Sequence, residues 1–184
     1  MKKVIVLVAV VVTMFMSNPC FAQINQCNGS LQGIKSIGVV VGDAPLTGKV
    51  DFLSQIKTDV EGRLRTAGIN VYDLDVLAKP KDKRKFFDTS GFLEINFFMK
   101  ELEKTKDQAS EQRVIYTILL VLRQRIELDR NDVKCLSPTW VEGSFNVTCL
   151  KSELEDKTRK NISDLVGIFL DAYATENPKQ TGKQ

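Results

Sequence analysis

Apolar side chains recur at every second position in residues 93–99 and, as an inner row, in residues 114–122, and this period of two constrains the fold more than any other feature. Because successive side chains of a strand point to opposite faces, residues 93–99 and 114–122 are each predicted to be a strand with one buried face. The polar connection from Glu103 to Arg113 has no apolar period, which favours an antiparallel pair joined by an open loop. The predicted buried rows are Leu93, Ile95, Phe97 and Met99, then Tyr116, Ile118, Leu120 and Leu122.

Two further segments carry apolar side chains at helical spacing and are predicted to be amphipathic helices. The first follows Gly48 and ends at Gly68, where a left-handed cap suits glycine. The second runs from Ser152 to Ala174 and stops before Asn177-Pro178, because proline disfavours helix for the residue that precedes it. The predicted buried stripes are Leu53, Ile56, Val60 and Leu64 in the first helix, and Leu154, Thr158, Ile162, Leu165, Phe169 and Ala172 in the second.

Short apolar runs predict the remaining strands. Residues 34–41 and 69–72 flank the first helix and form a strand, helix, strand unit, in which the strands are most often parallel. A last strand is predicted to begin at Thr139, and the strand that begins at Val114 is predicted to fade in the charged run 123–130. The sequence therefore predicts an α/β fold of two layers, a mixed sheet of about five strands with two helices on one face.

The opening of the chain has the order of a secretory signal. Two lysines precede the apolar run Val4 to Met16, and small residues follow at Cys20 and Ala22. The run is about 13 residues long, shorter than the ~20 that a transmembrane helix needs. A lipoprotein signal ending at Cys20 is the poorer alternative, because Asn18-Pro19 stands where small residues are required.

This opening predicts the organisation and location of the protein. We expect residues 1–22 to be a cleaved signal peptide, residues 23–178 a single α/β domain, and residues 179–184 a flexible tail. The protein is then periplasmic or secreted, and it does not span the membrane after cleavage.

Three cysteines stay in the mature chain, and an oxidising compartment favours their pairing. A disulfide between Cys135 and Cys149 requires a tight hairpin at Glu142-Gly143, which would bring the two residues opposite each other. If residues 138–147 are instead one extended strand, the two Cα atoms lie far beyond the ~7 Å limit for a bridge. A bridge from Cys27 to one of the other two, or no intrachain bridge, are the alternatives.

The chain contains no histidine, which removes the commonest general base and the commonest metal ligand. Hydrolysis by Ser-His or Cys-His pairs is excluded, and the sequence indicates no catalytic residue, metal site or cofactor. Once Lys2 and Lys3 are removed, 24 basic residues face 23 acidic ones, so the mature net charge is close to +1. That balance predicts no nucleic-acid partner.

Two loops carry candidate binding residues. Asp43 follows the first strand, at the carboxyl end where open α/β sheets place ligands. Residues 79–85 hold five basic side chains and one acidic one, enough to contact an anionic polymer such as a lipid headgroup surface, although a solvated loop is the simpler interpretation. Trp140 and Phe145 are predicted to pack in the core rather than to face a ligand. The candidate basic residues are Lys81, Lys83, Arg84 and Lys85.

Several short motifs resemble those of a group of small exported bacterial proteins of unknown function. The motifs are Ser30-Leu31-Gln32-Gly33-Ile34, Thr58-Asp59-Val60-Glu61 with Leu64-Arg65 and Ala67-Gly68-Ile69, Thr139-Trp140, and Asn177-Pro178. They span most of the mature chain. The resemblance implies the same order of elements and an exported protein, and it implies no activity.

Three functional hypotheses follow from these observations. The leading one is a non-catalytic binding or accessory protein of the bacterial cell envelope, with an envelope protein or an anionic polymer as its partner. The second is an enzyme that works without histidine through carboxylates, Asp43 among them. The third is a binder of anionic surfaces that acts through the basic loop.

Overall fold

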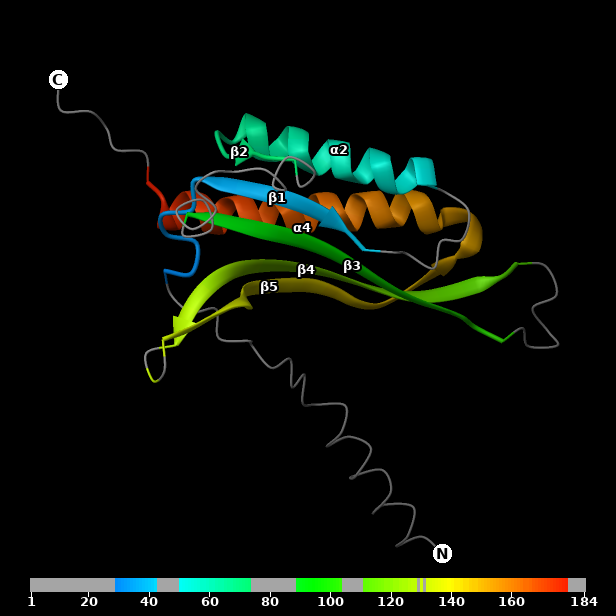
Figure 1. Cartoon of the computed structure of the whole chain (residues 1–184). Coiled ribbons are helices and arrows are strands. Elements are labelled where there is room, and N and C mark those ends of the chain that lie inside the picture. The colour runs from blue at the N-terminus through cyan, green and yellow to red at the C-terminus, as the bar shows by residue number, and fades with distance from the viewer. Residues whose placement is uncertain are drawn as a thin grey trace, which may run out of the picture.

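Five strands and two α-helices form a sheet layer and a helix layer in the part of the chain that the structure describes (Figure 1). The structure is a computed structural model that describes residues 29–42, 50–73, 89–103, 111–128, 130 and 132–178. The strands are β1 (Ser36–Val41), β2 (Asn70–Val71), β3 (Ser90–Glu101), β4 (Arg113–Leu128) and β5 (Val133–Leu150). The helices are α2 (Val50–Thr66) and α4 (Leu154–Glu176), and the short 3-10 helix η2 (Lys151–Glu153) leads into α4.

The strands form one mixed sheet in the order β2-β1-β3-β4-β5. β1 pairs in parallel with both β2 and β3, whereas β3, β4 and β5 form an antiparallel run. α2 packs on β1 and β2, α4 packs on β4 and β5, and the two helices contact each other, so both cover the same face. The predicted α/β fold is therefore confirmed. Among the described residues, no helix combines the length and the apolar character needed to cross a membrane.

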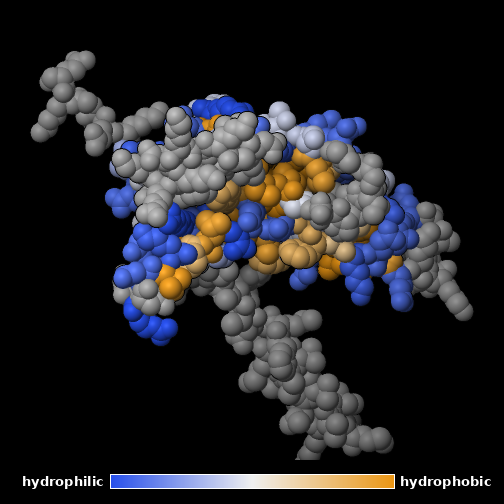
Figure 2. Space-filling view, in the orientation of Figure 1, coloured by the Kyte–Doolittle hydropathy of each residue, from blue (hydrophilic) through white to orange (hydrophobic). Residues whose placement is uncertain are grey.

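The core lies between the two layers and is built from the alternating rows that the sequence predicts. At its centre the ring of Trp140 on β5 meets the ring of Phe169 on α4 edge to face, with 5.1 Å between centroids. In the view of Figure 2, apolar side chains gather in a band through the middle of the molecule, and hydrophilic ones lie along the top and at both ends. The sheet contributes Ile37, Val39, Leu93, Ile95, Phe97, Tyr116, Ile118, Leu120 and Leu122, and the helices contribute Phe52, Ile56, Val60, Leu64, Leu154, Ile162, Leu165, Val166 and Phe169.

The carboxyl end of α4 is fixed to the segment that precedes β1. The Leu31 N–H donates to the Glu176 carboxylate at 2.6 Å, and the side-chain amide of Asn177 donates to the Leu31 carbonyl at 2.8 Å. The Gly33 N–H donates to Oδ1 of Asn177 at 2.9 Å. These bonds satisfy the N–H and the carbonyl of Leu31 and the N–H of Gly33, and they tie the first described residues to the last.

β5 is one continuous strand, and this differs from the sequence prediction in two ways. It begins at Val133 rather than Thr139, because the charged run 123–128 stays in β4 and pairs with it as far as Leu128 opposite Val133. Glu142 and Gly143 lie within the strand, opposite Leu120 and Leu119, and form no hairpin.

The predicted disulfide between Cys135 and Cys149 is therefore wrong in this structure. Both residues are free thiols, and they lie near opposite ends of β5. At ~3.3 Å per residue the strand path between them is on the order of 45 Å, against a limit of ~7 Å between bridged Cα atoms. Cys27 lies outside the described residues.

β5 also forms an outer edge of the sheet, and two features interrupt that edge. Pro138 has no N–H to offer to a neighbouring strand. Farther along, the register with β4 shifts between Tyr116 and Ile118, and Asn146 there adopts a left-handed φ of 53°. An extra residue of this kind bends a strand and disrupts its ladder locally.

Close packing around Gly143 explains why a glycine stands inside β5. A Cβ at this position would lie 2.7 Å from Cδ2 of Leu119, 2.9 Å from Cζ of Phe145 and 3.0 Å from the Ile118 carbonyl oxygen. By contrast, a Cβ at Gly62 in α2 would meet no atom within 4 Å.

We predict opposite effects for alanine at these two positions. Gly143→Ala should lower the free energy of unfolding by about 1–3 kcal/mol, because the packed neighbours must shift. Gly62→Ala should raise it by about 0.5–1 kcal/mol, because alanine is the better helix former. Urea unfolding followed by circular dichroism measures both, and a Gly143→Ala variant as stable as the wild type would contradict the close approach.

Candidate ligand groove between the two helices

A groove of about 470 Å³ lies between α2 and α4 and opens to solvent. Its volume falls within the range of ~300–1,000 Å³ typical of small-molecule sites. Its floor is apolar, because three residues of the core reach it from the two helices. The floor consists of Ile56, Val60 and Ile162, and the polar lining consists of Asp59, Arg63, Arg159, Lys160 and Ser163.

Helical periodicity places these residues on facing sides of the two helices. In α2, Ile56, Val60 and Arg63 follow one another at spacings of four and three, which keeps them on one face. In α4, Arg159 and Ile162 are three positions apart and therefore also share one face of the helix. The apolar members turn toward the sheet, and the longer cationic side chains extend past them toward solvent.

Arg159 forms the first bridge across the groove. Its guanidinium pairs with the Asp59 carboxylate at 3.3 Å and hydrogen-bonds the side-chain oxygen of Gln55. The same guanidinium lies over the ring of Phe52, 4.9 Å from its centroid, a distance at which a cation is attracted to an aromatic face. The charge of Arg159 is thus shared between one carboxylate, one amide and one ring.

Arg63 forms the second bridge. Its Nη1 donates to the carbonyl oxygen of Ser163 and, at 2.8 Å, to the Oγ of the same residue. Gly167 lies beside the other guanidinium nitrogen, and a Cβ there would be in ordinary van der Waals contact with it, at 3.6 Å. Both acceptors are neutral, so this bridge orients the guanidinium without cancelling its charge.

The groove is therefore electropositive. Three cations line it against the single carboxylate of Asp59, and among the described residues no carboxylate lies within ion-pair distance of Lys160. A partly enclosed site lined by one sign of charge concentrates counter-ions of the other sign. An apolar floor beneath a cationic rim suits a ligand with an apolar body and an anionic head.

A second polar cluster lies in the core, where α4 crosses β4 and β5. The side-chain amide of Asn161 donates to the Tyr116 hydroxyl at 2.8 Å and contacts the Ser144 Oγ at 3.3 Å. Burial, reinforced by Coulomb repulsion from Cys149, raises the pKa of Tyr116 to about 12. Burial likewise raises the pKa of the Cys149 thiol, an effect that Lys157 opposes. A protonated thiol is a poor nucleophile, so this cluster serves packing.

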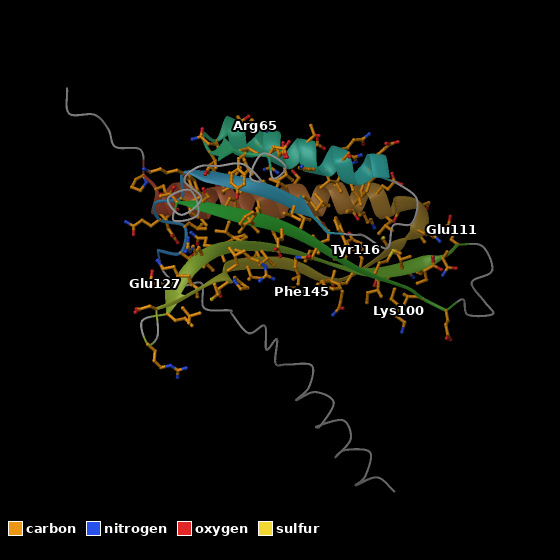
Figure 3. All side chains as sticks on the ribbon, in the orientation of Figure 1. Arg65, Lys100, Glu111, Tyr116, Glu127 and Phe145 are labelled. Carbon is orange, nitrogen blue, oxygen red and sulfur yellow. The ribbon has the colours of Figure 1, made fainter. Side chains whose placement is uncertain are left out.

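Most of the candidate binding residues named from sequence are not among the described residues. Asp43 and the basic residues Lys81, Lys83, Arg84 and Lys85 fall outside the described residues, so their roles stay predictions. Trp140 packs in the core as predicted, with 1% of its surface exposed, whereas Phe145 is 47% exposed (Figure 3). The Phe145 ring lies beside Gly143, on the face of the sheet that points away from the helices. Within the described ranges, no group of three or more cysteine, aspartate or glutamate residues is placed to hold a metal ion.

Sequence reasoning missed the groove because its cations look like ordinary solvated helix positions. Arg63 and Arg159 each lie on the polar side of an amphipathic helix, and nothing in a single helix shows that the two sides face each other. The sequence did carry one signal. Arg63 lies one turn from the buried Val60 in the first helix, and Arg159 lies one turn from the buried Ile162 in the second.

These features define a two-layer α/β protein with a cationic groove between its helices. No family model matches the chain, and no curated protein matches it. It is similar to the crystal structure of a minor lipoprotein from Acinetobacter baumannii, with 11% identity, a TM-score of 0.41 and coverage of 79% of this chain and 95% of that one. It is also similar to a neuraminyllactose-binding hemagglutinin homolog from Helicobacter pylori, with 10% identity, a TM-score of 0.36 and coverage of 83% and 86%. At these scores neither protein's activity transfers to this chain.

The raised pKa of Tyr116 predicts a loss of stability in alkali. A phenol titrates near ~10 when unfolded but near 12 in the folded protein, so the unfolded state loses its proton first as the pH rises. The stabilisation is complete below pH ~10 and is lost as the pH approaches ~12. Urea unfolding at several pH values across this window should show a steeper loss for the wild type than for Tyr116→Phe. Equal slopes would contradict the assignment.

Proposed function

We propose that the protein is a non-catalytic binding protein of the cell envelope and that the groove between α2 and α4 binds an anionic amphiphile. The observation that carries this proposal is the combination of an apolar floor, Ile56, Val60 and Ile162, with a rim of three cations. The ligand chemistry is a carboxylate or phosphate head on an alkyl chain.

Each half of such a ligand meets a matching part of the groove. An alkyl chain gains ~0.8 kcal/mol for each CH₂ removed from water, and the floor supplies the apolar contact. The head meets Lys160 and Arg63, whose positive charges no carboxylate of the groove lining offsets once Asp59 pairs with Arg159. Hydrogen bonds from a cation to a carboxylate or phosphate are among the stronger ones in proteins.

The envelope location is supported by the sequence. The opening segment has the charged, apolar and small-residue order of a secretory signal. An exported protein works where free amphiphiles and lipid headgroups are at hand, whereas nucleotides are scarce there. A binding role also agrees with the chemistry of the described core, where the buried thiol and phenol stay protonated at neutral pH.

The proposal predicts that Lys160 strengthens binding of an anionic probe. A dansyl-labelled undecanoic acid serves as the fluorescent probe, and unlabelled dodecanoate and octanoate compete for it. Lys160→Gln should weaken probe binding by about two- to fivefold, the range expected for one exposed charge pair. Dodecanoate should compete better than octanoate, because more CH₂ groups are buried.

Lys151→Gln is the matched control, because Lys151 is an exposed lysine of η2 that does not line the groove. It should bind the probe like the wild type. Dodecanol, which has the chain without the charge, should compete equally for the wild type and for Lys160→Gln. Equal losses in the two lysine variants, or the absence of saturable binding to the wild type, would refute the proposed ligand.

A further inference from the structure

Arg63 uses only part of its guanidinium to hold the two helices together. Its Nη1 donates to the carbonyl oxygen and to the Oγ of Ser163. A guanidinium carries more N–H donors than these two bonds use, and within the described part of the chain Nη2 and Nε donate to no acceptor. Nη2 lies beside Gly167, which has no side chain to cover it. Part of the Arg63 fork is therefore left for a ligand.

The hydroxyl of Ser163 is a second donor at the same place. Its oxygen accepts the bond from Arg63 at 2.8 Å, and a hydroxyl that accepts still has its own hydrogen to donate. Inside a helix that hydrogen often bonds the carbonyl one turn back, as the hydroxyls of Thr58 and Thr66 do at 2.9 Å. The Ser163 hydroxyl is exposed and reaches no acceptor among the described residues. The bond from a cation also polarises it, which makes it a better donor.

Lys160 adds a third set of donors on the other side of this hydroxyl. It precedes Ser163 by three positions, a spacing that puts both on the same face of α4, one turn apart, and both line the groove. Gly167 follows Ser163 by four positions and marks the turn beside which Nη2 of Arg63 lies. The Ser163 hydroxyl is thus flanked along α4 by a lysine one turn before it and by a guanidinium nitrogen one turn after it.

The one carboxylate of the groove is engaged elsewhere. Asp59 pairs with Arg159 at 3.3 Å, and a ring and an amide of α2 hold the same guanidinium. The two helices run in the same direction (Figure 1), so this pair crosses the groove one turn before the contact between Arg63 and Ser163. Among the described residues, no carboxylate lies within ion-pair distance of Arg63 or Lys160. Both of these charges are available to an anion.

We propose, on the basis of the function proposed above, that the groove selects a phosphate monoester head over a carboxylate and that Ser163 determines this preference. A carboxylate has two oxygens in one plane and a single charge. A phosphate monoester has three acceptor oxygens and a charge of about −1.5 to −2 at pH 7. Arg63 and Lys160 match that charge, and the Ser163 hydroxyl donates to the oxygen that a carboxylate lacks.

Competition between ligands that differ only in the head tests the preference. Dodecyl phosphate and tridecanoate carry the same alkyl chain, and each competes with dansyl-labelled undecanoic acid below its micelle concentration. The buffer is held at about pH 7.5, where the phosphate is largely dianionic. We expect dodecyl phosphate to displace the probe from the wild type at about tenfold lower concentration, the effect of one further hydrogen bond to a charged group.

Ser163→Ala tests the role of the hydroxyl. This change keeps the backbone carbonyl that holds Arg63, and alanine is a good helix former, so the fold should persist in circular dichroism. The variant should lose affinity for dodecyl phosphate by about three- to tenfold, the range for one hydrogen bond, and for tridecanoate by less than about twofold. Ser54→Ala is the matched control, because Ser54 is an exposed serine of α2 that does not line the groove. It should bind both ligands like the wild type.

The outcomes separate this inference from the proposed function. Equal affinity of the wild type for the two heads, or equal losses for both ligands in Ser163→Ala, would overturn the phosphate preference and leave a groove that binds amphiphiles. The absence of saturable binding of either amphiphile would refute both proposals. Inorganic phosphate, which lacks the chain, should compete about a hundredfold less well than dodecyl phosphate, because it buries no CH₂ groups. Equal competition by the two would assign the site to free phosphate and refute the amphiphile.

Discussion

The whole structure depends on covering one face of the mixed sheet with two helices. The helix-facing row of β3 and β4 is continuous and apolar, and it is stable only because α2 and α4 exclude water from it. The contact between Trp140 and Phe169 sits where α4 crosses β5. The bonds from Glu176 and Asn177 to Leu31 then fix the far end of the same helix.

The groove is a consequence of how this cover is assembled. Both helices bury their apolar stripes against the sheet, so their facing sides meet through polar groups. Arg159 and Arg63 span the gap to Asp59 and Ser163, and a space floored by the tops of core residues stays open between them. The site is thus made by the fold and needs no loop of its own, which places its cations on rigid elements.

Most of the fold followed from periodicity, because β3, β4 and both helices carry their buried residues at regular spacing. Residues 93–99 and 114–122 each carry an inner row of apolar side chains at every second position, and the stripe from Leu154 to Phe169 repeats at helical spacing, so local sequence indicated which side faced inward. β5 was the exception, because Gly143 reads as a turn signal. The structure shows that glycine is required there by the close approach of Leu119 and Phe145, a reason that appears only when β4 and β5 are paired. The groove was hidden for a related reason, since it needs two helices whose facing sides no single segment specifies.

The interruptions along β5 bear on how the protein behaves at high concentration. An unpaired outer strand of this length is a template on which another chain can add a strand, the first step toward fibrous aggregates. Pro138 has no N–H to donate, and the irregular register at Asn146 bends the ladder, so no uninterrupted ladder runs along the whole of this edge. The described edge of β5 thereby resists the pairing with a second copy that its length would otherwise invite.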